Sequence, residues 1–274
     1  MISKRTFLTA ALPFLASAAA SHAVTVTFDT AADFDNNFWT QETHSVVWNS
    51  NSGNGRIQKS DETNSAHRFI YNTTSTGGGG GTGGTSASST LNTFQDFTVQ
   101  ADYRSSSTGS AANSLGFWVK GNASGSAGYY VVFRLQDGSA NGGQADMRIW
   151  GPDSGGGGIG TALLASTDFT ATSNVASSTD YTFRLGIQDV SGGVRFTGSM
   201  WNVLTGQQIG SDINYTHSSV NAITGAGQVG IRIGTGGGGS VSAIDNFMIT
   251  PIPEPSAAAL GLIATAAAAF RRRR

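Results

Sequence analysis

Apolar and polar residues alternate with a period of two through most of the middle of this sequence. Between Phe97 and Tyr103, for example, every second residue is apolar (FTVQADY). This period sends successive side chains to opposite faces and is typical of a strand with one buried face. The pattern predicts strands at Val24–Phe28, His67–Tyr71, Phe97–Tyr103, Leu115–Lys120, Tyr129–Gln136, Ala145–Trp150, Tyr181–Gln188, Val194–Trp201, Gln228–Ile233 and Val241–Ile249.

The connections between these segments favour one all-β domain over residues 24–250. Gly, Ser, Thr and Asn dominate the connections, and no amphipathic helix is evident before residue 250. The stretch Asp189–Gly193 has the length and the glycines of a hairpin loop between two predicted strands. No internal segment changes composition as a linker would, and no repeat with a period of roughly 20–50 residues is present. We therefore expect a single domain.

Four segments of this domain carry a family resemblance: Phe94–Val99 (FQDFTV), Leu115–Val119 (LGFWV), Tyr129–Arg134 (YYVVFR) and Ala243–Phe247 (AIDNF). Their order resembles that of the concanavalin-A-like (laminin-G-like) family. The resemblance implies a two-sheet antiparallel jelly-roll sandwich in which the first and last strands pair. Such pairing would bring Asp29 near Asp245, and their oxygen atoms suit Ca²⁺, so a calcium site is expected there. The alternative is a turn aspartate and a strand-end aspartate that make only local hydrogen bonds.

The first 23 residues have the pattern of a signal peptide. Lys4 and Arg5 precede an apolar stretch that is too short to span a bilayer, and small residues follow it at Ser21 and Ala23. We expect cleavage between Ala23 and Val24 and export through the inner membrane. A buried N-terminal helix is the alternative, and the abrupt change to strand composition at Val24 disfavours it.

Residues 251–274 combine three features in a fixed order. The triad Pro253, Glu254 and Pro255 is followed by an uncharged stretch and then by four arginines, Arg271, Arg272, Arg273 and Arg274. This order resembles the PEP-CTERM sorting signal of Gram-negative bacteria. The resemblance implies processing by an exosortase-type enzyme, a transient stay in the inner membrane, and a final location at the cell surface or in the extracellular matrix.

The length of the uncharged stretch agrees with a temporary anchor. A helix over Ser256–Phe270 would rise about 22 Å, which is less than the ~30 Å hydrocarbon core of a bilayer. Arginines that reach the cytoplasmic surface would extend the span and fix its orientation. A short transmembrane helix that anchors the chain permanently is the alternative.

Composition and charge exclude several function classes. Glycine makes up 38 of the 274 residues, and only 12% of the residues are charged, which agrees with strands joined by many turns. Residues 24–250 hold ten basic and 16 acidic residues, a net charge of −6, so nucleic acid is a poor partner. The chain has no cysteine, which excludes disulfides, thiol catalysis and cysteine-based zinc sites.

Catalytic patterns are missing from the sequence. Glycoside hydrolysis normally needs two carboxyl groups that flank the scissile bond, and the Glu-x-Asp-x-Glu motif of jelly-roll glucanases is absent. Glu42 and Glu62 are the only glutamates in 24–250, and neither has a partner carboxyl at strand spacing. His44, His67 and His217 lie in three separate regions, and no Gly-x-Ser-x-Gly motif is present. We expect no catalytic residue.

A carbohydrate-binding surface is the remaining chemical signal. Aromatic and arginine residues occupy strand positions opposite the main apolar set: Trp118, Tyr130, Arg134, Arg148 and Trp150. Sugars stack their apolar faces on flat rings, and guanidinium groups donate hydrogen bonds in a fixed fork. The alternative is that the two tryptophans complete or cover the core.

These observations together predict an exported, non-catalytic surface or matrix protein. Its domain would act as an adhesive or carbohydrate-binding module, with extracellular polysaccharide as partner and Ca²⁺ as the one cofactor considered. A structural matrix component without a specific ligand is the main alternative, and a polysaccharide-active enzyme ranks third.

Overall fold

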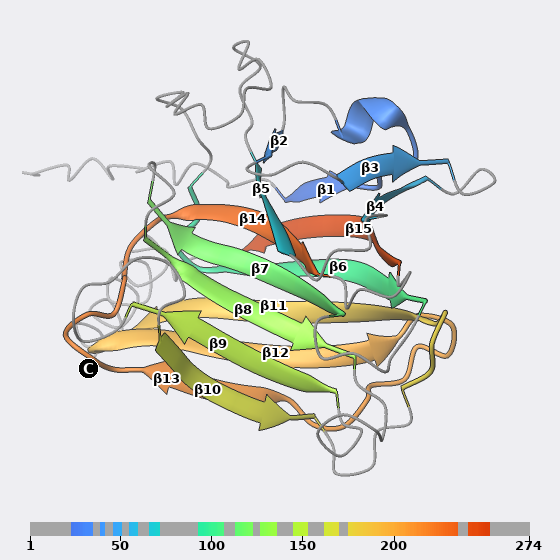
Figure 1. Ribbon diagram of the computed structural model, residues 1–274. Coiled ribbons are helices and arrows are strands. Elements are labelled where there is room, and N and C mark those ends of the chain that lie inside the picture. Colours follow the sequence, from blue (N-terminus) through green and yellow to red (C-terminus); the bar gives the residue numbers. More distant parts are fainter. Residues whose placement is uncertain are drawn as a thin grey trace, which may run out of the picture. The chain divides into compact units, whose positions relative to one another are not determined.

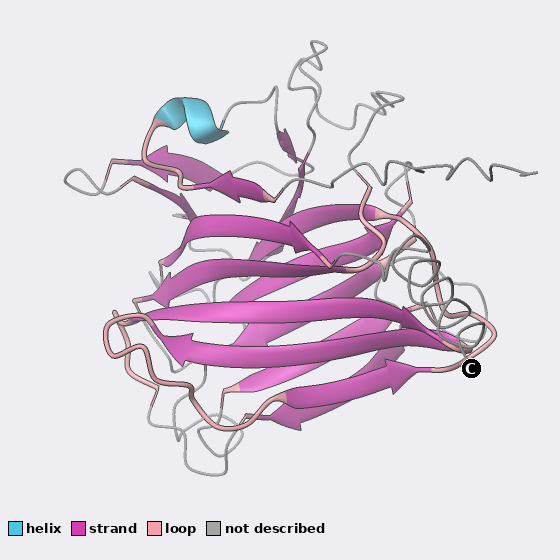
Figure 2. Cartoon of the chain, turned by 180° about the vertical axis from the view of Figure 1, so that it is seen from behind, coloured by secondary structure: helices cyan, strands magenta, loops and turns pink. Residues whose placement is uncertain are grey.

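The computed structural model describes residues 23–34, 39–41, 46–50, 55–59, 66–71, 93–106, 113–122, 127–135, 145–152, 162–169, 175–234 and 241–252. Strands make up most of this part, with one short 3₁₀ helix, η1 (Ala31–Phe34) (Figure 1 and Figure 2). Of the predicted sorting signal (251–274) the structure describes Pro251 and Ile252, and nearly all of the predicted signal peptide lies outside the described residues. Within the described ranges, no helix is long and apolar enough to cross a membrane.

The strands form two antiparallel sheets. The eight-stranded sheet has the order β13-β12-β11-β6-β15-β4-β3, and β1 also pairs with β15. Its members are β1 (Val24–Val26), β3 (Val46–Asn49), β4 (Arg56–Lys59), β6 (Phe97–Ser105), β11 (Asp180–Val190), β12 (Gly193–Asn202), β13 (Ile213–His217) and β15 (Ser242–Pro251).

The seven-stranded sheet has the order β10-β9-β8-β7-β14-β5-β2. Its members are β2 (Trp39–Gln41), β5 (Ala66–Tyr71), β7 (Ser114–Gly121), β8 (Tyr129–Arg134), β9 (Asp146–Gly151), β10 (Ala162–Asp168) and β14 (Gln228–Gly234). In Figure 1 the strands β7 to β10 of this sheet lie in front of β6, β11 and β12 of the other sheet.

The core lies between the two sheets and is built by the period-two alternation. Along β6, buried and partly exposed residues alternate without a break from Phe97 to Ser105. Aromatic rings join the sheets: Phe133 of β8 stacks on Phe183 of β11 with ring centroids 4.8 Å apart. Pairs of this kind add about 0.5–1.5 kcal/mol beyond the burial of their area. The all-β, two-sheet antiparallel jelly roll predicted from the sequence is therefore confirmed.

Several details of the prediction are confirmed as well. Every predicted strand is present, and β1 pairs with β15 as first and last strands. The Asp189–Gly193 stretch forms a hairpin, although β11 and β12 extend into it and leave a turn of two residues. Gly192 has φ 82°, a conformation that glycine adopts without steric cost.

Five strands were not predicted from the sequence: β2, β3, β4, β10 and β13. Each has only three to seven residues. In β10 and β13 the apolar positions are too few to show a clear period. Their backbone groups are nevertheless paired by longer neighbours, β9 and β12, which extend the sheets. Pairing with neighbouring strands therefore determines that these segments are strands, because their own sequence pattern does not.

Candidate functional site

Four side chains from neighbouring strands form a row on the face of the seven-stranded sheet that points away from the core. Trp118 of β7 lies opposite Tyr130 of β8, and Tyr130 lies opposite Trp150 of β9. Trp150 in turn lies opposite Leu163 of β10. Directly opposed residues of antiparallel strands point to the same face. We call Trp118, Tyr130, Trp150 and Leu163 the aromatic row.

The members of the aromatic row differ in exposure. Trp118 has 0% of its surface exposed, and a Cβ atom at Gly121 or Gly128 would overlap its indole ring. Tyr130 and Trp150 are partly exposed, and Leu163 is 44% exposed. Trp118 therefore packs as a structural residue and offers no stacking surface, which corrects the role expected for it. The open part of the row consists of Tyr130, Trp150 and Leu163.

An arginine that sequence reasoning missed reaches this row from β14. The guanidinium carbon of Arg232 lies 5.9 Å from the centroid of the Tyr130 ring, a cation–π distance. The Arg232 side chain crosses β7 at Gly116, where a Cβ atom would come within 3.1 Å of it. Arg232 alternates with the core residues Ile231 and Ile233, so its outward position could have been read from the sequence.

The two predicted arginines make an ion-pair network with a buried aspartate. Arg134 donates from Nε to Asp146 Oδ1 at 2.6 Å and from Nη2 to Asp146 Oδ2. Arg148 donates from Nε to Asp146 Oδ2 at 3.1 Å. Arg134 and Asp146 are 7% and 3% exposed, so the fork of Arg134 is used within the protein. The Arg148 side chain is 26% exposed, and its Nε bond is its one side-chain hydrogen bond to the described residues.

The network also contains a pair of carboxyl groups that the sequence did not reveal. Asp168 of β10 lies opposite Asp146 of β9 on the same outward face. Burial and then the charge of Asp146 raise the pKa of Asp168, while Arg134 and Arg148 oppose that rise. Both oxygens of Asp146 accept hydrogen bonds from arginine, so this carboxylate is not free to act as a nucleophile or base.

The predicted calcium residues lie in the region where β1 meets β15. Burial raises the pKa of Asp245 to about 6, and the nearby charges of Asp102 and Asp29 add to that rise. Asp102 lies directly opposite Asp245 on β6. In the part of the chain that the structure describes, no group of three or more His, Asp or Glu side chains is placed to hold a metal ion. The described residues offer an ion the carboxylates of Asp29, Asp102 and Asp245 in this region but not a complete ligand set.

Of the other candidates for catalysis, His217 is the one whose side chain the structure describes. Glu42, Glu62 and His44 lie outside the described residues, and the side chain of His67 is not described. His217 is 6% exposed and its Nδ1 atom lies 2.9 Å from the hydroxyl of Tyr129. No nucleophile and base therefore meet among the described residues that were candidates.

The topology and register define a class of protein by fold: an all-β lectin-like jelly-roll sandwich. No family model matches the sequence, and no curated protein is similar to it in sequence. Solved structures are similar in fold. The legume lectin-like domain of Entamoeba histolytica has a TM-score of 0.52 and 8% identity over 84% of this chain and 97% of that chain.

Two further structures have the same fold. Lectin II from Ulex europaeus has a TM-score of 0.52 and 9% identity, over 84% of this chain and 97% of the lectin. The exoplasmic/lumenal domain of VIP36, in a Ca²⁺/Man3GlcNAc-bound form, has a TM-score of 0.53 and 12% identity, over 86% of this chain and 92% of that domain. At these identities the likeness establishes the fold, and the ligand must be argued from the residues.

Proposed function

We propose that this chain is an exported, non-catalytic carbohydrate-binding module whose partner is extracellular polysaccharide. The observation that carries the proposal is the open part of the aromatic row, Tyr130, Trp150 and Leu163, on the outward face of the seven-stranded sheet. The lectins among the similar structures support the proposal as proteins of the same fold that bind sugars.

The row suits a saccharide for two physical reasons. Strands of one sheet lie roughly 4.8 Å apart, so Tyr130 and Trp150, which are opposed on adjacent strands, place two aromatic side chains next to each other on one face. Sugars have apolar faces of C–H groups that stack on such rings. Arg148 and Arg232 flank the row, and guanidinium groups donate to hydroxyl oxygens.

The state of the carboxyl groups favours binding over turnover. Glycosidases normally need two available carboxyl groups, one as acid and one as nucleophile or base. Asp146 is held by two arginines, and among the described residues of β9 and β10 Asp168 is the one carboxyl group left open on this face. Asp168 lies opposite Asp146, at the other end of β9 from Trp150, and it can accept a hydrogen bond from a sugar hydroxyl but does not form a catalytic pair with Asp146.

Export and sorting complete the proposal. The signal peptide (1–23) directs the chain through the inner membrane, and an exosortase-type enzyme processes the PEP-CTERM signal (251–274). The mature module then acts at the cell surface or in the extracellular matrix of a Gram-negative bacterium. A matrix component without a specific ligand is the alternative, and the binding experiment below separates the two.

The test is titration of the full chain with soluble oligosaccharides from extracellular polysaccharides. Trp150→Ala is expected to weaken binding roughly tenfold, since loss of one stacking ring is worth about 1.4 kcal/mol. Trp201→Ala is a matched control, because Arg184 lies 5.9 Å from the ring of Trp201 on the eight-stranded sheet. Equal affinity for wild type and Trp150→Ala would refute the site, and absence of binding to every saccharide would refute the function.

A further inference from the structure

A second candidate site lies away from the aromatic row. A pocket of about 580 Å³ opens between the β11–β12 turn and the segment that joins β13 to β14. Ser218, Ser219 and Thr224 line it, together with the apolar residues Val190 and Val220. Its volume is in the range of small-molecule sites. Val220 is fully exposed although it is apolar, so it lies at the open rim of the pocket.

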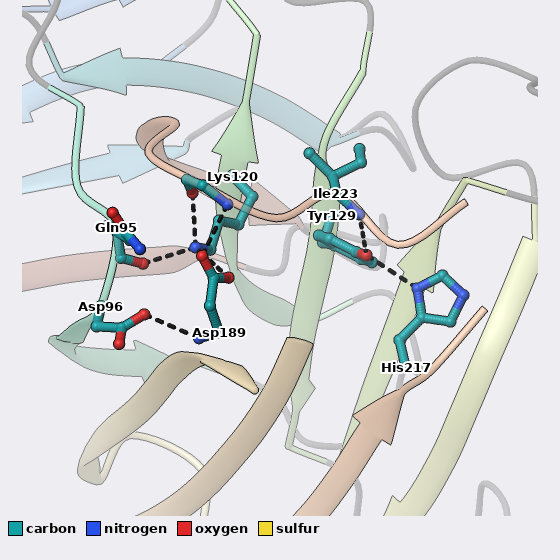
Figure 3. Close-up of polar contacts among 8 residues, drawn as sticks. Gln95, Asp96, Lys120, Tyr129, Asp189, His217 and Ile223 are labelled. Atoms are coloured by element: carbon teal, nitrogen blue, oxygen red, sulfur yellow. Dashed lines mark hydrogen bonds and ion pairs between the residues drawn. The ribbon is translucent and has the colours of Figure 1, made fainter. Parts of the chain in front are cut away.

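A buried lysine holds the segments around this pocket (Figure 3). The side chain of Lys120, at the end of β7, is 0% exposed. Its ammonium group donates three hydrogen bonds of 2.7 Å, to the carbonyl oxygens of Gln95 and Gly225 and to Oδ1 of Asp189. An ammonium group has three donors, so all of them are used. One cation thus ties the segment before β6, the end of β11 and the β13–β14 segment together.

Asp189 has hydrogen-bond partners for both carboxylate oxygens and for its backbone N–H. Its Oδ2 atom accepts a hydrogen bond of 2.7 Å from the backbone N–H of Gly225. The backbone N–H of Asp189 donates to Oδ1 of Asp96 at 2.8 Å. Because the carboxylate of Asp189 is neutralised by Lys120, it brings no net charge to the pocket that it lines.

A tyrosine and a histidine fix the same segment at a second point. The backbone N–H of Ile223 donates to the hydroxyl oxygen of Tyr129 at 2.9 Å, and this oxygen lies 2.9 Å from Nδ1 of His217 (Figure 3). Burial lowers the pKa of His217 and raises that of Tyr129 to about 12. At neutral pH the imidazole of His217 is therefore neutral, and its Nδ1 atom shares a hydrogen bond with the hydroxyl of Tyr129.

Lys120, Asp189 and Tyr129 fix the β13–β14 segment by more hydrogen bonds than a connection between two strands requires. Burying a charged ammonium group away from water is costly, and it is repaid only with good geometry and full hydrogen bonding. The segment is fixed at residues 223 and 225 by separate groups, so the part of the pocket next to these residues is held in place before any ligand arrives. A rigid site binds its ligand more tightly because less conformational entropy is lost when the ligand binds.

We propose that this pocket is a second saccharide site, one that takes a neutral, hydroxyl-rich sugar unit and needs no divalent metal. The ligand class rests on the proposed function, while the location rests on the pocket itself. Serine and threonine hydroxyls match sugar hydroxyls, and Val190 and Val220 match apolar sugar faces. The neutralised Asp189 leaves no charge to select an ionic ligand. The Lys120 ammonium group supplies the cation that organises the pocket, so a metal ion has no role in shaping it.

The test is calorimetric titration of the full chain with neutral mono- and disaccharides, in chelator and in millimolar Ca²⁺. The double variant Ser218→Ala/Thr224→Val is expected to lose at least tenfold in affinity for a saccharide that Trp150→Ala still binds, equally in both buffers. Unchanged binding by the double variant, or binding that requires Ca²⁺, would overturn the second site. If Trp150→Ala alone abolishes all binding, the proposed function stands and the second site falls. If the wild type binds no saccharide, both fall.

A positioning role for Lys120 is tested with a matched lysine. Lys59 of β4 is also fully buried, so Lys59→Met is the control for general loss of stability. Lys120→Met is expected to abolish the metal-independent binding and leave Trp150-dependent binding intact. Lys120→Arg, which keeps the charge, is expected to restore part of the affinity. Equal losses in Lys120→Met and Lys59→Met, with no recovery in Lys120→Arg, would contradict the positioning role.

Discussion

Asp245 should destabilise the folded domain at neutral pH. Asp245 is 8% exposed and faces the like charge of Asp102 on the adjacent strand, and carboxylates opposed in this way repel. Among the described residues, the backbone N–H of Asn246 donates a hydrogen bond of 2.8 Å to its carboxylate, and the charge of Arg56 also favours the ionised form. Asn246 has φ 49° at a bulge in β15, so this part of the strand is held in an unusual backbone conformation.

The magnitude follows from the raised pKa. The folded state holds Asp245 at a pKa of about 6, compared with 3.8 for an ordinary aspartate. Between these values the folded state binds more protons than the unfolded state, so stability falls as the pH rises through this window. A difference of about two pKa units corresponds to about 3 kcal/mol lost above pH 6.

Asp245→Asn removes the charge and keeps the shape. At pH 7 its melting temperature should exceed that of the wild type by roughly 6–12 °C, since each kcal/mol is worth roughly 2–4 °C for a domain of this size. Below about pH 3 the difference should disappear, because wild-type Asp245 is then protonated in both states. Asp212→Asn, at an exposed position, is the control and should show no such pH-dependent gain. A variant that melts at or below the wild-type temperature at pH 7 would refute this reasoning.

Three further outcomes are expected. Millimolar Ca²⁺ should raise the melting temperature by several degrees through Asp29 and Asp245, because an ion that binds only the folded state stabilises it. A melting curve that does not differ between chelator and excess Ca²⁺ would remove that site. The full chain should release no reducing sugar from a broad polysaccharide panel, and release that Asp168→Asn abolishes would show an enzyme. Mass spectrometry of the protein from its native host should find Arg271–Arg274 removed, and an intact tetra-arginine end would argue against exosortase processing.

The fold could be predicted from the sequence because the long strands show period-two alternation of apolar and polar residues. Period-two alternation fixes which face of β6, β8 or β11 is buried, and that pattern does not depend on the rest of the chain. The short strands β2, β3, β4, β10 and β13 gain order from their neighbours, and no local pattern could show this.

The site was predicted less completely, for reasons that particular residues show. Trp118 alternates like Tyr130, but its ring lies against Gly121 and Gly128, and contacts across a turn are not visible in a one-dimensional pattern. Arg134 and Asp146 are joined only because β8 and β9 pair in one register. Lys120 looks like a strand-end surface lysine in the sequence, and only the fold shows it buried among three oxygen atoms.

The central claim is that sugars bind on the aromatic row, and the indole N–H signals of the five tryptophans test it most directly. In a ¹⁵N-labelled full chain titrated with a binding oligosaccharide, the Trp150 signal should shift with ligand concentration. The signals of Trp118, which is buried, and of Trp201, on the other sheet, should stay in place. Saturating ligand that leaves Trp150 unmoved, or that moves Trp201 instead, would contradict the account.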